Sequence, residues 1–311
     1  MLELGEGLDM RGMTVLKANP LCTACLLTRR AYEVEEFSDD PSARIALFKS
    51  ILETANLYLG PDIEAALLAS MTYRRLRNML GSKDLYEDKK RKAYEVAKEK
   101  AKKLKDIIYS KKDAAEKLSL AIRASTVASV VQSVKYNLLK NELSSIPTLS
   151  DITAITLHRN DVNDFSNILR AKSSPTVVFM TGTVAELPYD YILMDVLRDS
   201  YSAYVLAMVR SEPYEAMVFK GDLEYAELED HVDEIVEFGS DTPTLIPGES
   251  SSKALARLEE ADVVIAKGCL QTLTLRNIGI AKPVLALLYI ECSVAARILG
   301  VREDTYNAIL L

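Results

Sequence analysis

The sequence predicts an α/β protein in which a helical N-terminal domain precedes a Rossmann-like α/β/α domain with a mostly parallel sheet. Apolar residues recur at helical spacing over residues 20–145, and from residue 175 short apolar runs alternate with amphipathic stretches. The chain has 311 residues, which is enough to bury a substantial core. We therefore expect a helical domain at residues 1–150 and the Rossmann-like domain at residues 151–311.

The N-terminal half is predicted to be helical. Apolar residues recur three and four positions apart around Leu47 and Ile51, which is the spacing of one helix face. Asp39-Asp40-Pro41 is typical of a helix start with proline in the first turn. Gly60-Pro61 and Gly81-Ser82 interrupt the helical pattern, as loops do.

The segment from Lys89 to Lys117 carries the densest charge in the chain. Its acidic residues lie three or four positions from lysines, which is typical of an exposed helix with ion pairs along its surface. The alternative is a binding surface for nucleic acid or another anionic partner. A net charge of −7 disfavours an extended nucleic-acid surface, so the solvated helix is the preferred interpretation.

The C-terminal half is predicted to contain a parallel sheet. Continuous apolar runs at 177–180, 204–209, 263–266 and 284–288 are typical of strands covered on both faces. Helices are expected near 190–201, 222–236, 252–260 and 292–299, as right-handed crossovers between these strands. The domain boundary is expected between residues 145 and 175, where Ser144-Ser145-Ile146-Pro147 opens a looser stretch.

Composition excludes several classes of protein. No apolar run approaches the roughly 20 residues that span a bilayer. The first twelve residues resemble neither a signal nor a transit peptide, so we expect a cytoplasmic protein. The two histidines, His158 and His231, are too few for a histidine-rich zinc site, and no motif places either of them in a nucleophilic triad.

The first predicted strand of the sheet ends at a candidate binding site. Thr181-Gly182-Thr183 follows it directly, and Glu186 and Asp190 come within the next turns. Ligands of open α/β sheets bind at the carboxyl ends of the strands. A divalent metal at such a place needs hard oxygen ligands, whereas Gly182 and Thr183 offer at most one hydroxyl.

Lys267-Gly268 and the cysteines are further candidates. Lys267 follows another predicted strand, where it can either hold a phosphate or simply cap the sheet edge. Cys22 and Cys25 form a Cys-x-x-Cys pair, which marks half a zinc site or a redox pair. A metal site or disulfide that joins them to Cys292 is the candidate, and structural thiols are the default interpretation.

Several landmarks together resemble the damage-control phosphatase family, a former domain of unknown function that is also called the acidic-residue-methyltransferase-like metal-binding domain. The resemblance covers about residues 20 to 305 and rests on four segments in the family's order. These are Cys22-Thr23-Ala24-Cys25, Asp84-Leu85-Tyr86, Ala261-Asp262 with the following run to Lys267-Gly268, and Leu287-Leu288-Tyr289-Ile290-Glu291-Cys292.

The resemblance implies a helical domain packed on a Rossmann-like domain. It also implies hydrolysis of phosphate monoesters of small metabolites with a divalent metal, such as manganese, cobalt, nickel or magnesium. The family's metal ligands, however, correspond to Gly182 and Thr183 after one strand and to Ala216 and Met217 after the next. Glu186 and Asp190 match retained family positions.

Two hypotheses follow from these departures. The favoured one is a non-catalytic or weakly active relative, a pseudoenzyme that binds a small phosphorylated metabolite or a protein partner in the interdomain cleft, around Gly182, Thr183, Glu186, Asp190, Lys267 and Gly268. The alternative is an active phosphomonoesterase for sugar or cofactor phosphates, in which Glu186, Asp190, Glu215 and Asp222 regroup around a displaced metal.

Overall fold

A seven-stranded sheet organises the fold. The computed structural model describes residues 17–134, 143–246 and 248–311. The strand order is β1-β7-β6-β5-β2-β3-β4, and all neighbours are parallel except the antiparallel pair β6 and β7. The strands are β1 Arg159–Asn160, β2 Thr176–Met180, β3 Tyr204–Val209, β4 Glu234–Glu237, β5 Val263–Lys267, β6 Val284–Ile290 and β7 Thr305–Leu310. The predicted α/β class and mostly parallel sheet are thus confirmed.

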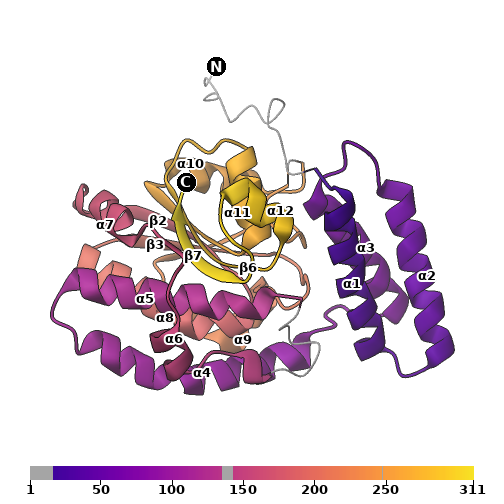
Figure 1. Cartoon of the computed structure of the whole chain (residues 1–311), viewed down its shortest axis with the longest axis horizontal. Coiled ribbons are helices and arrows are strands. Elements are labelled where there is room, and N and C mark those ends of the chain that lie inside the picture. The colour runs from indigo at the N-terminus through magenta and orange to yellow at the C-terminus, as the bar shows by residue number, and fades with distance from the viewer. Residues whose placement is uncertain (1–16, 135–142, 247) are drawn as a thin grey trace.

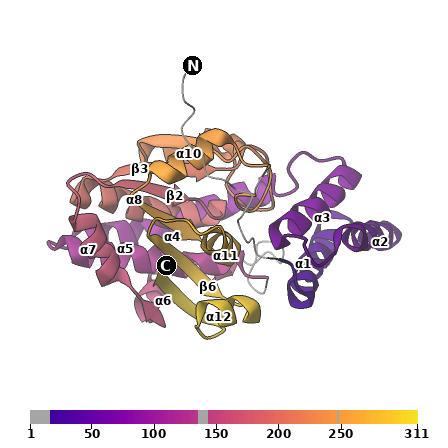
Figure 2. The same ribbon diagram turned by 90° about the horizontal axis from the view of Figure 1, so that it is seen from above.

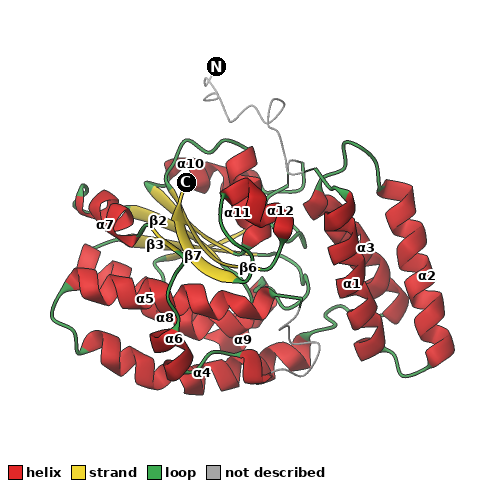
Figure 3. Cartoon of the chain, in the orientation of Figure 1, coloured by secondary structure: helices red, strands yellow, loops and turns green. Residues whose placement is uncertain are grey.

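Alternating side chains of the strands face two separate helix layers. Val177 and Phe179 pack into the core formed with helices α4, α5 and α8, whereas Val178 and Met180 pack into the core formed with α10 and α11. Figure 3 shows the sheet in yellow between these helices. The helices beside the sheet are α4 Glu87–Tyr109, α5 Ala114–Ala128, α6 Leu149–Ala154, α7 Val162–Arg170, α8 Leu187–Tyr201, α9 Leu223–Ala226, α10 Ser252–Glu260, α11 Cys269–Asn277 and α12 Ser293–Leu299.

Three N-terminal helices form a separate bundle at one side of the sheet (Figures 1 and 2). They are α1 Pro20–Phe37, α2 Pro41–Tyr58 and α3 Ala65–Leu80. Val34, Leu47, Ile51 and Leu76 form their shared core. The side chain of Asp40 caps α2, and Pro41 lies in its first turn, as the sequence predicted.

Helices α4 and α5 pack with the α/β layers, since both contact α8 and α5 also contacts β6 and β7. Three lysines of α4 form ion pairs with acidic residues later in the sequence: Lys90 pairs with Asp222, Lys98 with Glu227, and Lys105 with Asp195. The division of the chain at residue 150 remains a prediction. In the part of the chain that the structure describes, no helix is both long and apolar enough to cross a membrane. Cytoplasmic location likewise remains a prediction.

The prediction of one helix over residues 222–236 is wrong. This segment contains the short helix α9 and then strand β4, which pairs with Leu206 to Val209 of β3. Only Val236 of β4 is fully buried. As an edge strand with two glutamates, β4 lacks the continuous apolar run of its neighbours. Its strand conformation therefore depends on pairing with β3 and not on a pattern visible in the sequence.

Candidate functional site

The candidate site lies at the carboxyl ends of β2 and β5. These two strands are neighbours, and the chain continues from β2 to β3 on one side and from β5 to β6 on the other. Such a reversal in strand order creates a crevice where α/β proteins bind ligands. Gly182 and Gly268 follow the two strands, and the structure therefore brings together the residues predicted from the sequence.

A buried ammonium group occupies the centre of the site. Lys267 Nζ lies 2.9 Å from Asp190 Oδ1 and 3.2 Å from Glu186 Oε1. It also donates to the hydroxyl of Ser125, at 2.8 Å, and to the carbonyl of Ser125. The side chains of Lys267, Asp190 and Glu186 are fully buried. Lys267 therefore lies in the interior and not at an exposed sheet edge, and its donors serve the chain's own oxygens; its role in ligand binding remains a prediction.

The pKa values of this cluster reflect burial and mutual attraction. Burial raises the pKa of the Asp190 carboxyl to about 7, with Glu186 adding to the rise and Lys267 opposing it. Burial acts to lower the pKa of Lys267, yet the nearby Asp190 and Glu186 carboxylates raise it overall. The lysine is thus held in its charged form, and Asp190 is the carboxyl that can take up a proton and so reduce the negative charge of the cluster.

Gln132 and Glu186 close the space beside the two strand-end glycines. Glu186 Oε2 accepts from the N–H of Thr183 at 2.7 Å and from its hydroxyl at 2.9 Å, in a capping box at the start of a 3₁₀ turn. Gln132 Nε2 donates to the same oxygen at 2.8 Å. A side chain at Gly182 or Gly268 would clash with Gln132. The end of the Gln132 side chain would therefore have to shift if either glycine carried a Cβ, and the end of Glu186 if Gly182 did.

Two other acidic candidates pair with cations of their own. Glu215, which has a φ of 47°, pairs with Arg29 at 2.6 Å and also with Arg30, both on α1. Burial acts to raise the pKa of Glu215, but the two arginines lower it overall. Asp222 pairs with the buried Lys90 at 2.7 Å. Each acid is therefore committed to its own cation, and the regrouping that the alternative hypothesis requires is absent from the described residues.

The donor set does not fit a divalent metal. Gly182, Ala216 and Met217 supply no side-chain oxygen, and Thr183 Oγ1 is already bonded to Glu186. Across residues 17–134, 143–246 and 248–311, no group of three or more histidine, cysteine or acidic side chains is arranged to hold a metal ion. Hard cations need several oxygen ligands at short distance. The two carboxylates of the site instead surround the Lys267 ammonium.

A cavity of about 230 Å³ opens beside this cluster. Helices α1 and α3 line one part of it, and the starts of α11 and α12 line another. The cysteines predicted as metal ligands, Cys22, Cys25 and Cys292, all line this cavity together with Cys269. Their thiols are free, and they form no metal-holding group within the described residues, so their metal role remains a prediction.

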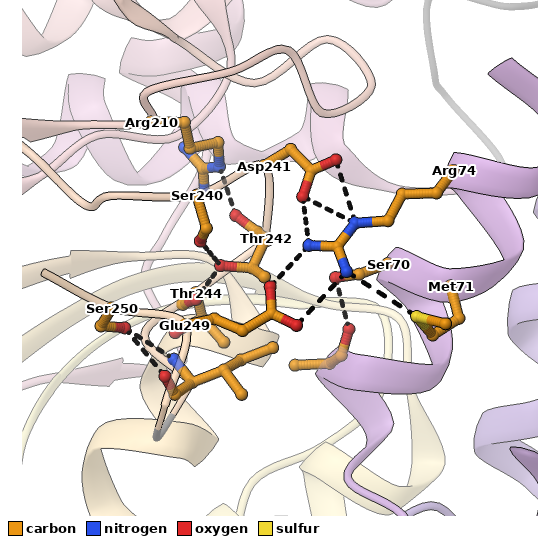
Figure 4. A network of polar contacts seen from close by, with 12 residues as sticks. Ser70, Met71, Arg74, Arg210, Ser240, Asp241, Thr242, Thr244, Glu249 and Ser250 are labelled. Carbon is orange, nitrogen blue, oxygen red and sulfur yellow. Dashed lines mark hydrogen bonds and ion pairs between the residues drawn. The ribbon is translucent and has the colours of Figure 1, made fainter. Parts of the chain in front are cut away.

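A second polar network connects the helical bundle to the loop that precedes α10 (Figure 4). Arg74 of α3 donates to Asp241 at 2.8 Å and to Glu249 at 2.5 Å. Arg210 is fully buried, and it donates to the carbonyls of Thr242 and Pro243. Burial lowers the pKa of Arg210 to about 10. Pro243 also lines the cavity, so this network positions one of its walls.

Sequence reasoning missed Gln132 and Arg29 as site residues. Arg29 Nη2 donates to the carbonyl of Gln132, and both side chains line the cavity. Neither belongs to a strand end or to a recognisable motif, so no sequence signal distinguished them from ordinary helical residues.

The chain is similar to known proteins over nearly its whole length. The model of the damage-control phosphatase ARMT1-like domain matches residues 18–306. A damage-control phosphatase of Archaeoglobus fulgidus is 27% identical over 92% of this chain and 96% of its own length. An uncharacterised protein of Methanocaldococcus jannaschii is 25% identical over 95% of both chains. The crystal structure of a DUF89 family protein from Pyrococcus horikoshii has the same fold, with a TM-score of 0.79 and 21% identity over 94% of this chain and 99% of that chain.

Proposed function

The chain belongs to the damage-control phosphatase ARMT1-like family, and from that premise we propose that it binds a small phosphorylated molecule with little or no metal-dependent hydrolysis. The cavity beside Lys267 is the binding place. One observation carries the proposal: the Lys267 ammonium lies between Glu186 and Asp190, the two acids that remain at the strand ends.

Metal-dependent hydrolysis needs a cation that polarises the phosphate and activates water. Here a lysine ammonium pairs with the two remaining carboxylates, and it cannot activate water as a divalent ion does. Binding does not require a metal, because the first N–H groups of α11 have no acceptor inside the helix and line the cavity. Helix α11 starts at Cys269, directly after Gly268. Small molecules bind in concave cavities lined by several elements, and a cavity of this kind therefore favours a small molecule over a protein partner.

The alternative function is an active metal-dependent phosphomonoesterase for sugar or cofactor phosphates. One observation favours it: Asp190 Oδ2 is buried and has no hydrogen-bond partner among the described residues. A buried acceptor without a donor costs free energy, and a metal would satisfy it. The pKa of Asp190, raised to about 7 by burial, offers another explanation, since a proton on that carboxyl satisfies it equally.

The two functions are separated by measuring binding and turnover on the same protein. We expect inorganic phosphate to bind in calorimetry to the same extent with and without manganese. We expect p-nitrophenyl phosphate to be hydrolysed no faster than in buffer with manganese, cobalt, nickel or magnesium. Metal-dependent turnover that Asp190→Asn abolishes, while the exposed Asp199→Asn leaves it intact, would overturn the proposal.

A further inference from the structure

Every cysteine of the chain lines one cavity. The sequence contains four cysteines, and the lining of the cavity of about 230 Å³ beside Lys267 includes Cys22, Cys25, Cys269 and Cys292. The first two belong to α1, Cys269 begins α11, and Cys292 directly precedes α12. All four thiols are free. The fold thus gathers the thiol chemistry of the whole chain in a single place.

Cys22 and Cys25 lie where a disulfide can close between them. They are three positions apart in α1, so their side chains leave the same face of the helix. This spacing separates two Cα atoms of a helix by roughly 5 Å, which is within the range of about 4.4–6.8 Å found in disulfides. The Cβ atoms of such a pair are about 5–6 Å apart, against about 3.5–4.5 Å in a disulfide. Closing the bond therefore requires the helix to yield by about 1 Å.

The start of α1 is the part of the helix that can yield. Pro20 has no N–H, and the N–H of Cys22 donates to the side chain of Asn19 at 3.0 Å. The N–H of Thr23 donates to the carbonyl of Asn19 at 3.0 Å, so the regular backbone pattern begins only after Cys22. Cys22 can therefore move toward Cys25 by giving up a side-chain cap. A disulfide closed in this way is strained, and strained disulfides are readily reduced.

The four thiols differ in their access to solvent. Cys25 is exposed, whereas the other three are half-buried. Cys269 Sγ donates to the carbonyl of Tyr289 at 3.6 Å, and burial raises the pKa of this thiol to about 12. Burial also raises the pKa of Cys25, and Arg29 opposes that rise. A reagent from solution therefore reaches Cys25 first, and Cys22 is the thiol on the same helix face.

We propose that Cys22 and Cys25 form a reversible oxidation site, which exchanges with small disulfides and so changes one wall of the cavity. The Cys25 thiolate attacks one sulfur of the external disulfide, which forms a mixed disulfide and releases one external thiolate. The Cys22 thiolate then attacks the sulfur of Cys25, which closes the protein disulfide and releases the second external thiolate. The protons of the two cysteines pass through solvent to the released thiolates. The cysteine pair is thereby oxidised and the external disulfide is reduced. No step depends on the proposed function.

Peptide mapping of the full chain tests this exchange. The reduced protein is incubated at pH 8 with mixtures of 2-hydroxyethyl disulfide and 2-mercaptoethanol, and the remaining thiols are then labelled with N-ethylmaleimide. Trypsin places Cys22 and Cys25 together in the peptide of residues 18–29, Cys269 in 268–276 and Cys292 in 277–297. We expect the 18–29 peptide to lose its label and two hydrogen atoms, while the other two peptides keep their label. Excess 2-mercaptoethanol should restore the label.

Single serine substitutions separate the two steps. Cys22→Ser removes the second thiol, so the mixed disulfide on Cys25 should accumulate. Cys25→Ser removes the first attacking thiol, and we expect Cys22 in this variant to stay labelled. Cys292→Ser is the matched control, because Cys292 lines the same cavity from another segment, and oxidation of the 18–29 peptide should proceed as in the unchanged chain. Circular dichroism confirms that each variant folds.

The same measurements can overturn the inference. A disulfide that joins the 18–29 peptide to either of the other two would assign the exchange to a different pair of cysteines. Oxidation that occurs only in urea would assign it to the unfolded chain, and no mixed disulfide in Cys22→Ser would exclude Cys25 as the first nucleophile. We expect the folded chain to need a higher ratio of disulfide to thiol than the same chain in urea, because closure strains the start of α1. An equal or lower ratio would contradict this geometry.

Discussion

Replacing Lys267 by methionine gives the sharpest test of the buried charge cluster. Methionine has nearly the length of lysine but no charge, so the substitution removes the ammonium and preserves most of the packing. Asp190 and Glu186, which lie 2.9 and 3.2 Å from Nζ, would remain fully buried without their cation. Removing one partner of a buried pair costs about 3–5 kcal/mol, and we expect the free energy of unfolding at pH 8 to fall by that amount.

The loss should depend on pH in a defined direction. Burial raises the pKa of Asp190 to about 7 in the folded protein, against about 3.9 in the unfolded chain. Between these two pKa values the folded state binds more protons, so its stability falls as the pH rises. Lys267 opposes the rise of the Asp190 pKa, and its removal therefore extends this pH range upward. A tenfold change in the acidity of the carboxyl corresponds to about 1.4 kcal/mol, so the variant should lose markedly less stability at pH 5 than at pH 8.

Urea unfolding followed by far-ultraviolet circular dichroism at the two pH values measures both losses. Lys98→Met is the matched control, because Lys98 pairs with Glu227 at 2.7 Å and both side chains are 48% exposed. We expect this control to lose less than about 1 kcal/mol at either pH. Equal losses for the two variants, or a Lys267→Met loss that does not grow from pH 5 to pH 8, would refute the reasoning.

Two further predictions concern the strand-end glycine and the thiols. A methyl group at Gly182 would come closest to Glu186 Oε2 and would lie 2.7 Å from the Gln132 amide nitrogen, so Gly182→Ala should lower the free energy of unfolding by about 1–3 kcal/mol in a denaturant titration. Gly60→Ala meets nothing within 4 Å and serves as its control, and an equal loss there would contradict the packing argument. Burial raises the pKa of Cys269 to about 12 and also raises that of Cys25, but Cys25 is exposed whereas Cys269 is half-buried, so iodoacetamide at pH 8 should alkylate Cys25 before Cys269. Mass spectrometry of timed samples measures the order, and faster modification of Cys269 would contradict it.

The sequence identified the strands that are covered on both faces, because their apolar runs report burial directly. The run at 177–180 lies within β2, and the run at 263–266 lies within β5. Once those strands are placed, parallel pairing brings their carboxyl ends together, which is why Gly182 and Lys267 were found as neighbours. The edge strand β4 was missed because its structure depends on the hydrogen bonds to β3.

The contacts inside the site could not be predicted from the sequence in the same way. Gln132 reaches Glu186 across 54 positions, and Arg29 reaches Glu215 across 186 positions. Such contacts depend on the packing of helices against strand ends, and local residue patterns do not predict them. The sequence therefore located the crevice but left open which cation occupies it.

The occupied centre of the site bears directly on the two functional alternatives. A divalent ion between Glu186 and Asp190 would lie close to the Lys267 ammonium, and the like charges would repel each other strongly in a buried setting. The lysine cannot simply turn away, because its donors satisfy Ser125 and both acids in a fully buried space. An active metal enzyme would therefore need new oxygen ligands and also displacement of this ammonium. Phosphate binding at the start of α11 needs neither change, and for this reason we propose binding rather than metal-dependent hydrolysis.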